Sequence, residues 1–360
     1  MTQNFAKFLI KWYSLYSRKL PWRNSGDPYK IWLSEVILQQ TRVDQGLAYY
    51  NSFVEHYPSI HELSNAHIDE VMKLWQGLGY YSRARNLYAG AQQIVREFNG
   101  VFPADYKSIR SIKGIGDYTA GAIASIAFNL PYPAIDGNVL RVITRIASIS
   151  TPVDTTAGKS EIHNFLMEII DKNQAGTFNQ ALMELGATIC KPKSPLCNEC
   201  PVNEFCIAFI ENTHQNFPVK RTKLKPKNRY FLYLIPTFMI GDEKNTLMGK
   251  RSGKDIWFNL YDFPLIEASK EEDLSNSQLP EILQNTFTNP DFTVLKISGL
   301  IKHQLSHQTI YTRFLHLDFA SLPKFVVPND YRYIPLNMIH ELAIPRLIDR
   351  YLSGKNVLIY

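Results

Sequence analysis

The chain has 360 residues, of which 45% are apolar and 20% charged, and its formal net charge is +6. This composition excludes a disordered, collagen-like or coiled-coil protein, and the length predicts two folded domains. The small excess of Lys and Arg permits a polyanionic partner without requiring one. The sequence has neither an apolar run of membrane-spanning length nor a basic-then-apolar signal segment, so we expect a cytoplasmic protein that contacts no membrane.

Residues 29–217 are predicted to be mostly helical. Apolar side chains recur at helical spacing in stretches around residues 31–43, 71–87 and 162–169. Pairs of proline and glycine residues mark the turns between these stretches. The pattern therefore predicts a mostly helical first domain.

One carboxyl group in this part has unusual neighbours. Glu35 has Ile31, Trp32 and Leu38 one helical turn away. Burial on such an apolar stripe would raise the pKa of the carboxyl group, which is how a protein keeps a general acid protonated near neutral pH. A helix cap or a salt bridge is the simpler interpretation, and Glu35 alone does not decide between them.

A glycine-flanked turn at residues 112–116 follows a short predicted helix at 106–111 and precedes a long alanine-rich helix. Gly114 and Gly116 let the backbone turn tightly and approach a phosphate group, which the N–H groups at the next helix start can bind. The segment predicts a helix, a hairpin and a helix, a pattern that an ordinary helix–helix turn shares. Asp136 supports the functional interpretation, because it stands at a turn before another amphipathic helix.

All cysteines of the chain lie in one short loop, residues 190–206, with the spacing C-x6-C-x2-C-x5-C. Without an export signal, clustered thiols predict one metal or iron–sulfur site rather than disulfides. Zinc is an alternative because four thiolates satisfy its tetrahedral preference, although zinc ribbons usually present two C-x2-C pairs. A [4Fe–4S] cluster accepts uneven spacing because its corners are spread over a larger object. The ligands in either case are Cys190, Cys197, Cys200 and Cys206.

Residues 217–229 are predicted to form a basic linker. They carry six cations and no acid between residues 218 and 229. The segment is either a solvated connector or a strap along a phosphate backbone, and the sequence does not decide between the two.

Beyond the linker the sequence pattern changes to short β-rich runs interrupted by helical stretches, which predicts an α+β domain. The β-rich runs lie at residues 230–235, 238–240 and 309–317, and the helical stretches near 280–287 and 337–352.

The helix–hairpin–helix, the aspartate and the cysteine loop together resemble the endonuclease III superfamily of base-excision DNA glycosylases. Within it the chain resembles the adenine DNA glycosylases, the MutY family, over nearly its whole length. Residues 34–41 are similar to the family's catalytic-acid helix, and residues 75–85 to its intercalating turn. Position 118 is Tyr where the bifunctional lyases place the lysine that forms a Schiff base, so the expected amine nucleophile is missing.

The resemblance implies a mostly α helix–hairpin–helix glycosylase domain over residues 1–216, with a [4Fe–4S] cluster in the cysteine loop. It implies an α+β Nudix-like domain over residues 230–360, in which 256–264 resembles the family's tryptophan-to-proline strand. Residues 271–273 are acidic but lack the arginine and glycine frame of Nudix hydrolases, which argues against a pyrophosphatase.

The implied activity is that of a monofunctional DNA glycosylase, which flips adenine paired with 8-oxoguanine or guanine out of duplex DNA and hydrolyses its N-glycosidic bond. By resemblance, Glu35 protonates adenine N7 and Asp136 stabilises the oxocarbenium ion. Tyr118 and Asn138 orient the acid and the sugar. The adenine pocket is implied to contain Trp22, Arg23, Leu38 and Gln180.

The resemblance also implies which residues contact DNA and the oxidised base: Gln40, Thr41, Leu78, Tyr80, Gly114, Gly116, Ser306 and His307. The family's Phe-Ser-His loop is Leu305-Ser306-His307 in this chain, so the aromatic side chain is replaced by leucine while both polar groups are kept. We expect a monomer associated with the nucleoid.

Two other functions belong to different classes. The chain could be a bifunctional endonuclease III-like glycosylase/lyase for oxidised pyrimidines, against which Tyr118 argues. It could also be a non-catalytic DNA-damage-binding protein, against which the pair Glu35 and Asp136 argues.

Overall fold

The computed structural model divides into two compact units. The first consists of Met1–Ala66 and Arg85–Thr222, and the second of His67–Ala84 and Lys223–Tyr360. The contacts thus group residues 67–84 with the second unit, whereas the domain boundaries at 216 and 230 stay a prediction from the sequence. The residues described are 2–23, 25–221, 226–253, 255–288, 291–326 and 330–354, so that residues 222–225 of the predicted linker lie outside them.

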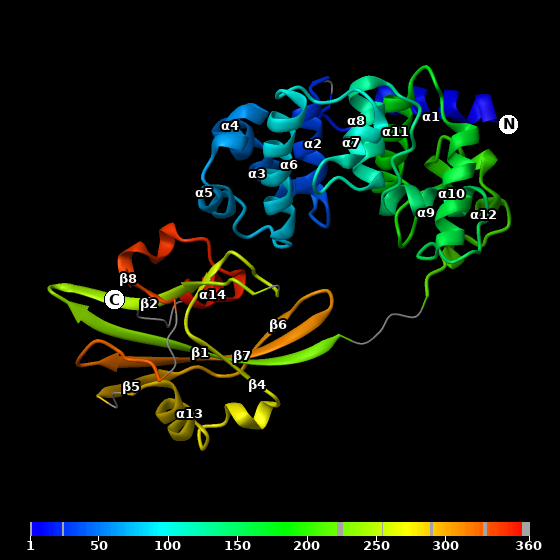
Figure 1. Ribbon diagram of the computed structural model, residues 1–360. Coiled ribbons are helices and arrows are strands. Elements are labelled where there is room, and N and C mark those ends of the chain that lie inside the picture. Colours follow the sequence, from blue (N-terminus) through cyan, green and yellow to red (C-terminus); the bar gives the residue numbers. More distant parts are fainter. Residues whose placement is uncertain are drawn as a thin grey trace. The chain divides into compact units, whose positions relative to one another are not determined.

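The first unit is helical, as the sequence predicts (Figure 1). Among the described residues, no helix combines the length and apolar character that crossing a bilayer requires. The α-helices of the first unit are α1 (Thr2–Tyr16), α2 (Pro28–Leu38), α3 (Val43–His56), α4 (Ile60–Asn65), α6 (Ser82–Phe98), α7 (Tyr106–Ser111), α8 (Asp117–Phe128), α9 (Gly137–Ile146), α10 (Thr156–Ile169), α11 (Ala175–Thr188) and α12 (Ile207–Ile210). Its 3₁₀ turns are η1 (Cys197–Glu199), η2 (Asn203–Phe205) and η3 (His214–Asn216).

Helix α2 is a central helix of the first unit and packs against α3 and α8. Asp27 caps it by accepting a hydrogen bond of 2.9 Å from the backbone N–H of Tyr29, and Pro28 occupies the first turn, where its missing N–H costs nothing. Residues 31–37 are all buried, so the helix is covered on every side rather than along one stripe. Glu35 is therefore carried into the interior by its helix.

The predicted helix–hairpin–helix is confirmed as α7, a turn and α8. Gly114 has a φ of +83°, and a Cβ atom there would lie 2.5 Å from the Cβ of Asn86, so only glycine fits. Gly116 is the N-cap of α8 and is exposed. Arg110 holds the turn by donating a hydrogen bond of 2.8 Å to the carbonyl of Ile115.

A hydrophobic core lies between α1, α9, α10 and α11, with Leu9 and Phe178 among its fully buried side chains. Cys190, Cys200 and Cys206 pack against this core, so the cysteine loop is supported by it.

The second unit contains α5 (Ile68–Leu74) and a mixed sheet in which neighbouring strands follow the order β3-β2-β1-β7-β5 (Figure 1). Off this path, β4 pairs with β1, β6 with β7 and β8 with β2. The strands are β1 (Lys227–Ile240), β2 (Glu243–Lys250), β3 (Tyr261–Asp262), β4 (Leu265–Ala268), β5 (Phe292–Ile297), β6 (Ile301–Gln304), β7 (Gln308–Phe319) and β8 (Arg332–Pro335). The remaining elements are η4 (Glu271–Leu274), α13 (Leu279–Thr286), η5 (Leu336–Glu341) and α14 (Arg346–Leu352).

The central strand β1 is covered on both faces of the sheet. Leu232 and Leu234 face the core that contains Leu283 of α13. On the alternate positions Tyr233 stacks on Phe314, and the ring of Phe314 stacks at 3.8 Å on Tyr351 of α14. The alternation confirms an α+β unit with a helix on each face of the sheet.

Two predicted β-rich runs, 230–235 and 238–240, form one continuous strand. Pro236 interrupts the sequence pattern but not β1, because it lies where the partner on one side changes from β4 to β2. A proline that lacks an N–H donor fits at such a change of partner.

The segment 256–264 was expected to be a strand, and most of it is a tight turn. Trp257 and Asn259 have φ angles of +62° and +64°, and the N–H of Leu260 donates to the carbonyl of Trp257 at 3.0 Å. Positive φ angles do not occur in strands, so pairing is confined to β3.

The helical stretch expected at 337–352 is two elements. A 3₁₀ turn, η5, ends at Glu341, and α14 begins at Arg346. Pro345 separates them, because a proline disfavours the helical conformation of the residue before it.

Candidate functional site

The first unit contains a pocket of about 410 Å³ that brings together predicted residues from distant parts of the sequence. Both predicted carboxyl groups, Glu35 and Asp136, line it. The other predicted residues in its wall are Trp22, Arg23, Leu38, Thr41, Tyr118, Asn138 and Gln180. The volume is within the usual range for a small-molecule site, which makes this pocket the candidate active site.

Glu35 is 8% exposed and has a specific partner. The hydroxyl of Tyr118, from the first turn of α8, donates a hydrogen bond to Oε2 of Glu35. Burial raises the pKa of Glu35 to about 7, the hydrogen bond from Tyr118 opposes part of this rise, and the charge of Asp136 adds to it. A carboxyl group with this pKa exchanges its proton near neutral pH, so it can act as an acid or as a base.

Asp136 stands before an amphipathic helix, as expected, and is the N-cap of that helix, α9. Its Oδ1 accepts from the backbone N–H of Val139 at 2.7 Å, and its Oδ2 accepts from Nδ2 of Asn138 at 2.8 Å. Burial raises the pKa of this carboxyl group, while the two hydrogen bonds act in the opposite direction. The carboxylate is thus fixed in orientation within the pocket.

A further carboxylate in the pocket wall, that of Glu184, was not predicted from the sequence. Glu184, on α11, is fully buried and is held by Arg18 and Arg23. Its partners lie more than 160 residues away in the chain, and α11 looks like an ordinary amphipathic helix, so no local pattern signalled this contact. The pocket is also lined by Arg42 and Asp44.

Gln40, predicted to contact DNA, follows α2 in an unusual backbone conformation. It is exposed and has a φ of +58°, which is rare for a residue other than glycine. Such conformations gather at functional sites, where surrounding structure maintains them. The structure thus presents the Gln40 side chain to solvent.

The predicted DNA-contacting residues of the second unit lie in two turns. Tyr80 is 47% exposed and has a φ of +48°, whereas Leu78 is 7% exposed, so Leu78 is part of the packing in this conformation. Ser306 and His307 are exposed at the tip of the hairpin between β6 and β7, as predicted. The hydroxyls of Tyr80 and Ser306 are hydrogen-bonded to each other, so the structure brings these two residues together.

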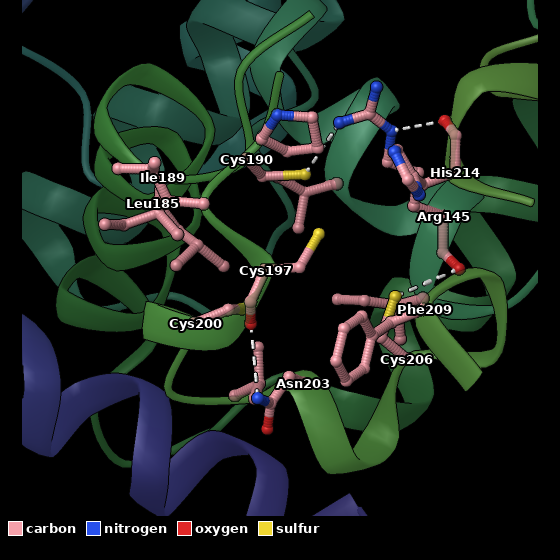
Figure 2. Close-up of a pocket in the computed structure, with 15 residues that line it drawn as sticks. Arg145, Leu185, Ile189, Cys190, Cys197, Cys200, Asn203, Cys206, Phe209 and His214 are labelled. Atoms are coloured by element: carbon pink, nitrogen blue, oxygen red, sulfur yellow. Dashed lines mark hydrogen bonds between the residues drawn. The ribbon is translucent and has the colours of Figure 1, made fainter. Parts of the chain in front are cut away.

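The cysteine loop surrounds its own pocket, separate from the one that contains Glu35. Figure 2 shows the four cysteines around one space with Arg145 at its rim. All four are half-buried, and the pocket holds about 410 Å³ that protein atoms do not fill, part of it open to solvent. Nη1 of Arg145 lies 3.2 Å from Sγ of Cys190 and can donate to it.

The arrangement of the thiols fits a cluster better than a single ion. Among the residues that the structure describes, no three His, Cys, Asp or Glu side chains converge closely enough to hold one metal ion. The four thiols instead line the wall of a shared space, as a [4Fe–4S] cluster with separated corners needs. A cluster held there supplies a rigid cross-link between distant parts of the loop.

Arg141 connects the cysteine loop with the candidate active site. Its Nε donates to the carbonyl of Cys190 at 2.8 Å, and its Nη2 donates to Oδ1 of Asn138 at 2.9 Å. Because Asn138 also donates to Asp136, one chain of hydrogen bonds joins the loop to the carboxylate.

The chain matches three family models. Residues 33–172 match the HhH-GPD superfamily of base excision DNA repair proteins, and residues 190–206 match the iron–sulfur binding domain of endonuclease III. Residues 237–354 match the NUDIX domain. The predicted fold class and the iron–sulfur cofactor are confirmed by these matches and by the structure.

The chain is similar over nearly its full length to several adenine DNA glycosylases. An adenine DNA glycosylase of Buchnera aphidicola subsp. Acyrthosiphon pisum is 36% identical over 357 residues, which is 98% of each chain. An adenine DNA glycosylase of Homo sapiens is 30% identical over 391 residues, covering 94% of this chain and 72% of that protein. The solved structure of a thermostable thymine-DNA glycosylase is 25% identical with a TM-score of 0.54, over 58% of this chain and 97% of that one.

Purified protein is expected to be yellow-brown and to contain about four iron atoms per chain, because four thiolates hold a [4Fe–4S] centre. Iron analysis with visible absorption checks this expectation. Replacement of Cys200 by Ser removes one of the four ligands and should lower the iron content and bleach the colour. Colourless protein with stoichiometric zinc, prepared from iron-replete cells, would contradict the assignment.

Proposed function

The chain belongs to the adenine DNA glycosylases, enzymes of base excision repair that hydrolyse N-glycosidic bonds, and from this we propose that its substrate is adenine paired with 8-oxoguanine or guanine in duplex DNA. The observation that carries the proposal is a buried, protonatable Glu35 in the same pocket as the oriented carboxylate of Asp136. We propose that the protein acts as a monomer on nucleoid DNA in the cytoplasm.

Glu35 supplies the proton that makes adenine a leaving group. The target base is inside the duplex, so it enters the pocket only after flipping out of the stack. With a pKa of about 7, Glu35 keeps a large protonated fraction at neutral pH and can pass its proton to N7 of the base. The Tyr118 hydroxyl donates to Oε2 of Glu35 and so fixes the carboxyl group in place.

Asp136 acts on the sugar. Departure of the protonated base breaks the bond between C1′ and N9 and leaves positive charge on the sugar, which a nearby carboxylate stabilises. Asn138 and the N–H of Val139 hold this carboxylate in place. A water molecule then adds its oxygen to C1′ and gives up a proton, which completes hydrolysis.

The lyase alternative lacks a nucleophile in the pocket. Schiff-base chemistry needs an amine, and the cations among the described residues that line the pocket are arginines. Tyr118 occupies the position where the bifunctional enzymes carry lysine. Borohydride trapping on an abasic duplex would reveal a lyase if this interpretation were wrong.

The test of the proposal is adenine release from defined duplexes. With an 8-oxoguanine:adenine duplex, single-turnover reaction followed by alkali should cleave the adenine strand at the mispaired base. A thymine:adenine duplex is the control and should stay intact. An inactive holoenzyme that binds the duplex tightly would favour the non-catalytic alternative.

We expect Ser306 and His307 to recognise the oxidised base. Oxidation turns N7 of guanine from an acceptor into an N–H donor, to which a hydroxyl can offer an acceptor. A neutral hydrogen bond contributes about 0.5–1.5 kcal/mol, so losing two should reduce the preference for 8-oxoguanine:adenine over guanine:adenine by about 10- to 100-fold. Single-turnover rates of Ser306→Ala with His307→Ala on both duplexes measure this ratio.

Two further variants make this experiment specific. His340→Ala changes an exposed histidine elsewhere in the second unit and should leave the ratio unchanged. Tyr80→Phe removes the hydroxyl that bonds Ser306 and keeps the ring, so it separates an indirect effect through Tyr80 from direct recognition. An unchanged ratio in the double variant would mean that discrimination resides with Gln40 and Tyr80 instead.

A further inference from the structure

Two arginines converge on one carboxylate in the wall of the candidate active site. Glu184 accepts from Nε and Nη2 of Arg18 at 2.8 Å each and from the backbone N–H of the same residue at 3.0 Å. It also accepts from Nη2 of Arg23 at 2.7 Å. The Glu184 side chain is 0% exposed, so its carboxylate oxygens are removed from bulk water.

The arrangement fixes both guanidinium groups. Arg18 meets the carboxylate with two hydrogen bonds, from Nε to Oε1 and from Nη2 to Oε2, and such a bidentate contact adds geometric specificity. Arg23 also donates from Nη1 to the carbonyl of Arg18 at 2.9 Å, and its guanidinium lies 5.4 Å from the centre of the Tyr13 ring. Arg23 is 11% exposed, so little space remains for another orientation.

Glu184 stays ionised at every pH at which the enzyme would work. Burial alone would raise the pKa of its carboxyl group, but the hydrogen bonds from Arg18 and Arg23 outweigh burial and lower the pKa to about 2. A buried carboxylate without these partners would be strongly unfavourable. The three groups therefore form one unit with a net charge of +1.

This unit lies in the same pocket as Glu35, and its charge matters there. Tyr118 donates to Glu35 from α8, and Asp136 faces it from the start of α9. The positive charge of Arg23 lowers the pKa of Glu35. The remaining charged groups that line the pocket are Arg18, Arg42, Asp44 and Glu184.

We propose that Glu184 is a positioning residue for base removal, which fixes Arg23 on the pocket wall that receives the flipped base and offsets one of the two positive charges of Arg18 and Arg23 in the pocket that contains Glu35. This inference rests on the proposed function. It adds a residue that contacts neither the base nor the sugar and acts through the two arginines. Its carboxylate lies on α11, a helix that supplies Gln180 to the same pocket.

Two substitutions should shift the upper pH limit of the reaction in opposite directions. Glu184→Gln keeps the volume but raises the net charge of the unit to +2, which favours ionised Glu35. The upper pH limit of the single-turnover rate should then shift down by about one pH unit, and the rate at pH 7 should fall about fivefold. Arg18→Gln leaves a neutral pair of Arg23 and Glu184, so the same limit should shift upward.

The measurements are single-turnover rates against pH on bound 8-oxoguanine:adenine duplex, with binding measured separately. Glu184→Gln combined with Arg18→Gln restores the net charge of +1 and should return the pH limit toward that of the unaltered enzyme. Glu168→Gln, on the exposed face of α10, changes the net charge equally and should leave the profile unchanged.

If Glu184 has only a structural role, its substitution should lower the stability of the protein without shifting the upper pH limit of the rate. An unchanged pH limit in both Glu184→Gln and Arg18→Gln, with an active unaltered enzyme, would overturn the inference and leave the proposed function intact. Should Glu184→Gln fail to fold, Arg18→Gln decides alone, because Arg18 is 40% exposed and its removal leaves Glu184 paired with Arg23. An unaltered holoenzyme that releases no adenine would instead refute the proposed function.

Discussion

Replacing Glu35 by Gln should abolish adenine release and preserve duplex binding. Glutamine keeps the volume of the side chain and can still accept from the Tyr118 hydroxyl, but it has no proton to deliver to the base. General acid catalysis contributes about 10²- to 10⁴-fold, and the loss should reach the upper end because Glu35, with a pKa of about 7, is the proposed proton donor. Single-turnover release and a gel-shift titration with the same duplex measure the two properties.

The same variant should gain stability at alkaline pH. The pKa of Glu35 is about 7 in the folded protein and near 4.5 when exposed, so the folded state binds the proton more tightly. Between these values stability falls as the pH rises, and the cost above pH 7 is about 3 kcal/mol by linkage. Glutamine carries no such cost, so its Tm should exceed that of the unaltered protein at pH 8 but not at pH 4.

Glu55→Gln is the matched control, since Glu55 is an exposed glutamate on α3. It should change neither the rate nor the pH dependence of the Tm. Adenine release by Glu35→Gln within tenfold of the unaltered enzyme would show that another group supplies the proton.

Local patterns predicted the elements that carry the chemistry. Gly114 has the positive φ that its turn requires, and Asp136 caps α9. A turn and a helix start each depend only on neighbouring residues, so a local pattern can indicate them. The cysteine spacing likewise predicted a loop that surrounds one space. Sequence alone could identify these parts because the residues that form each of them lie within one short segment of the chain.

Contacts between distant segments could not be predicted from the sequence pattern. Glu184 and Arg18 are 166 residues apart, and nothing near either one indicates its partner. The apolar stripe of α2 suggested one buried face, whereas residues 31–37 are all buried in a helix that packs against both α3 and α8, so Ser34 and Glu35 are part of the interior. Burial on all sides is a tertiary property, and it decides the pKa on which the proposed chemistry rests.

Backbone conformation adds a second kind of information that residue types do not carry. Gln40 and Tyr80, two of the residues proposed to contact DNA, both combine exposure with a positive φ. A side chain on such a backbone is costly to maintain, so its presence at both positions agrees with a functional constraint.

Asp136→Asn should reduce single-turnover adenine release by at least about 10³-fold while the protein keeps its stability. Asparagine caps helices about as well as aspartate, so its side-chain oxygen can still accept from the N–H of Val139, but it brings no negative charge to the sugar. Removing one neutral donor from a transition-state site costs about 10²- to 10³-fold, and a full charge opposite a cationic sugar is worth more.

Asp105→Asn is the matched control for this loss, because Asp105 caps α7 by accepting from the N–H of Ser108 at 2.9 Å and does not line the pocket. Both variants replace an N-cap carboxylate by an amide, so they should lower the Tm by similar, small amounts. Only the change at position 136 should affect the chemical step, since Asp136 is the carboxylate that we propose acts on the sugar. Equal rates for the two variants would mean that Asp136 serves as a helix cap alone, and that the positive charge on the sugar is stabilised by another group in the pocket.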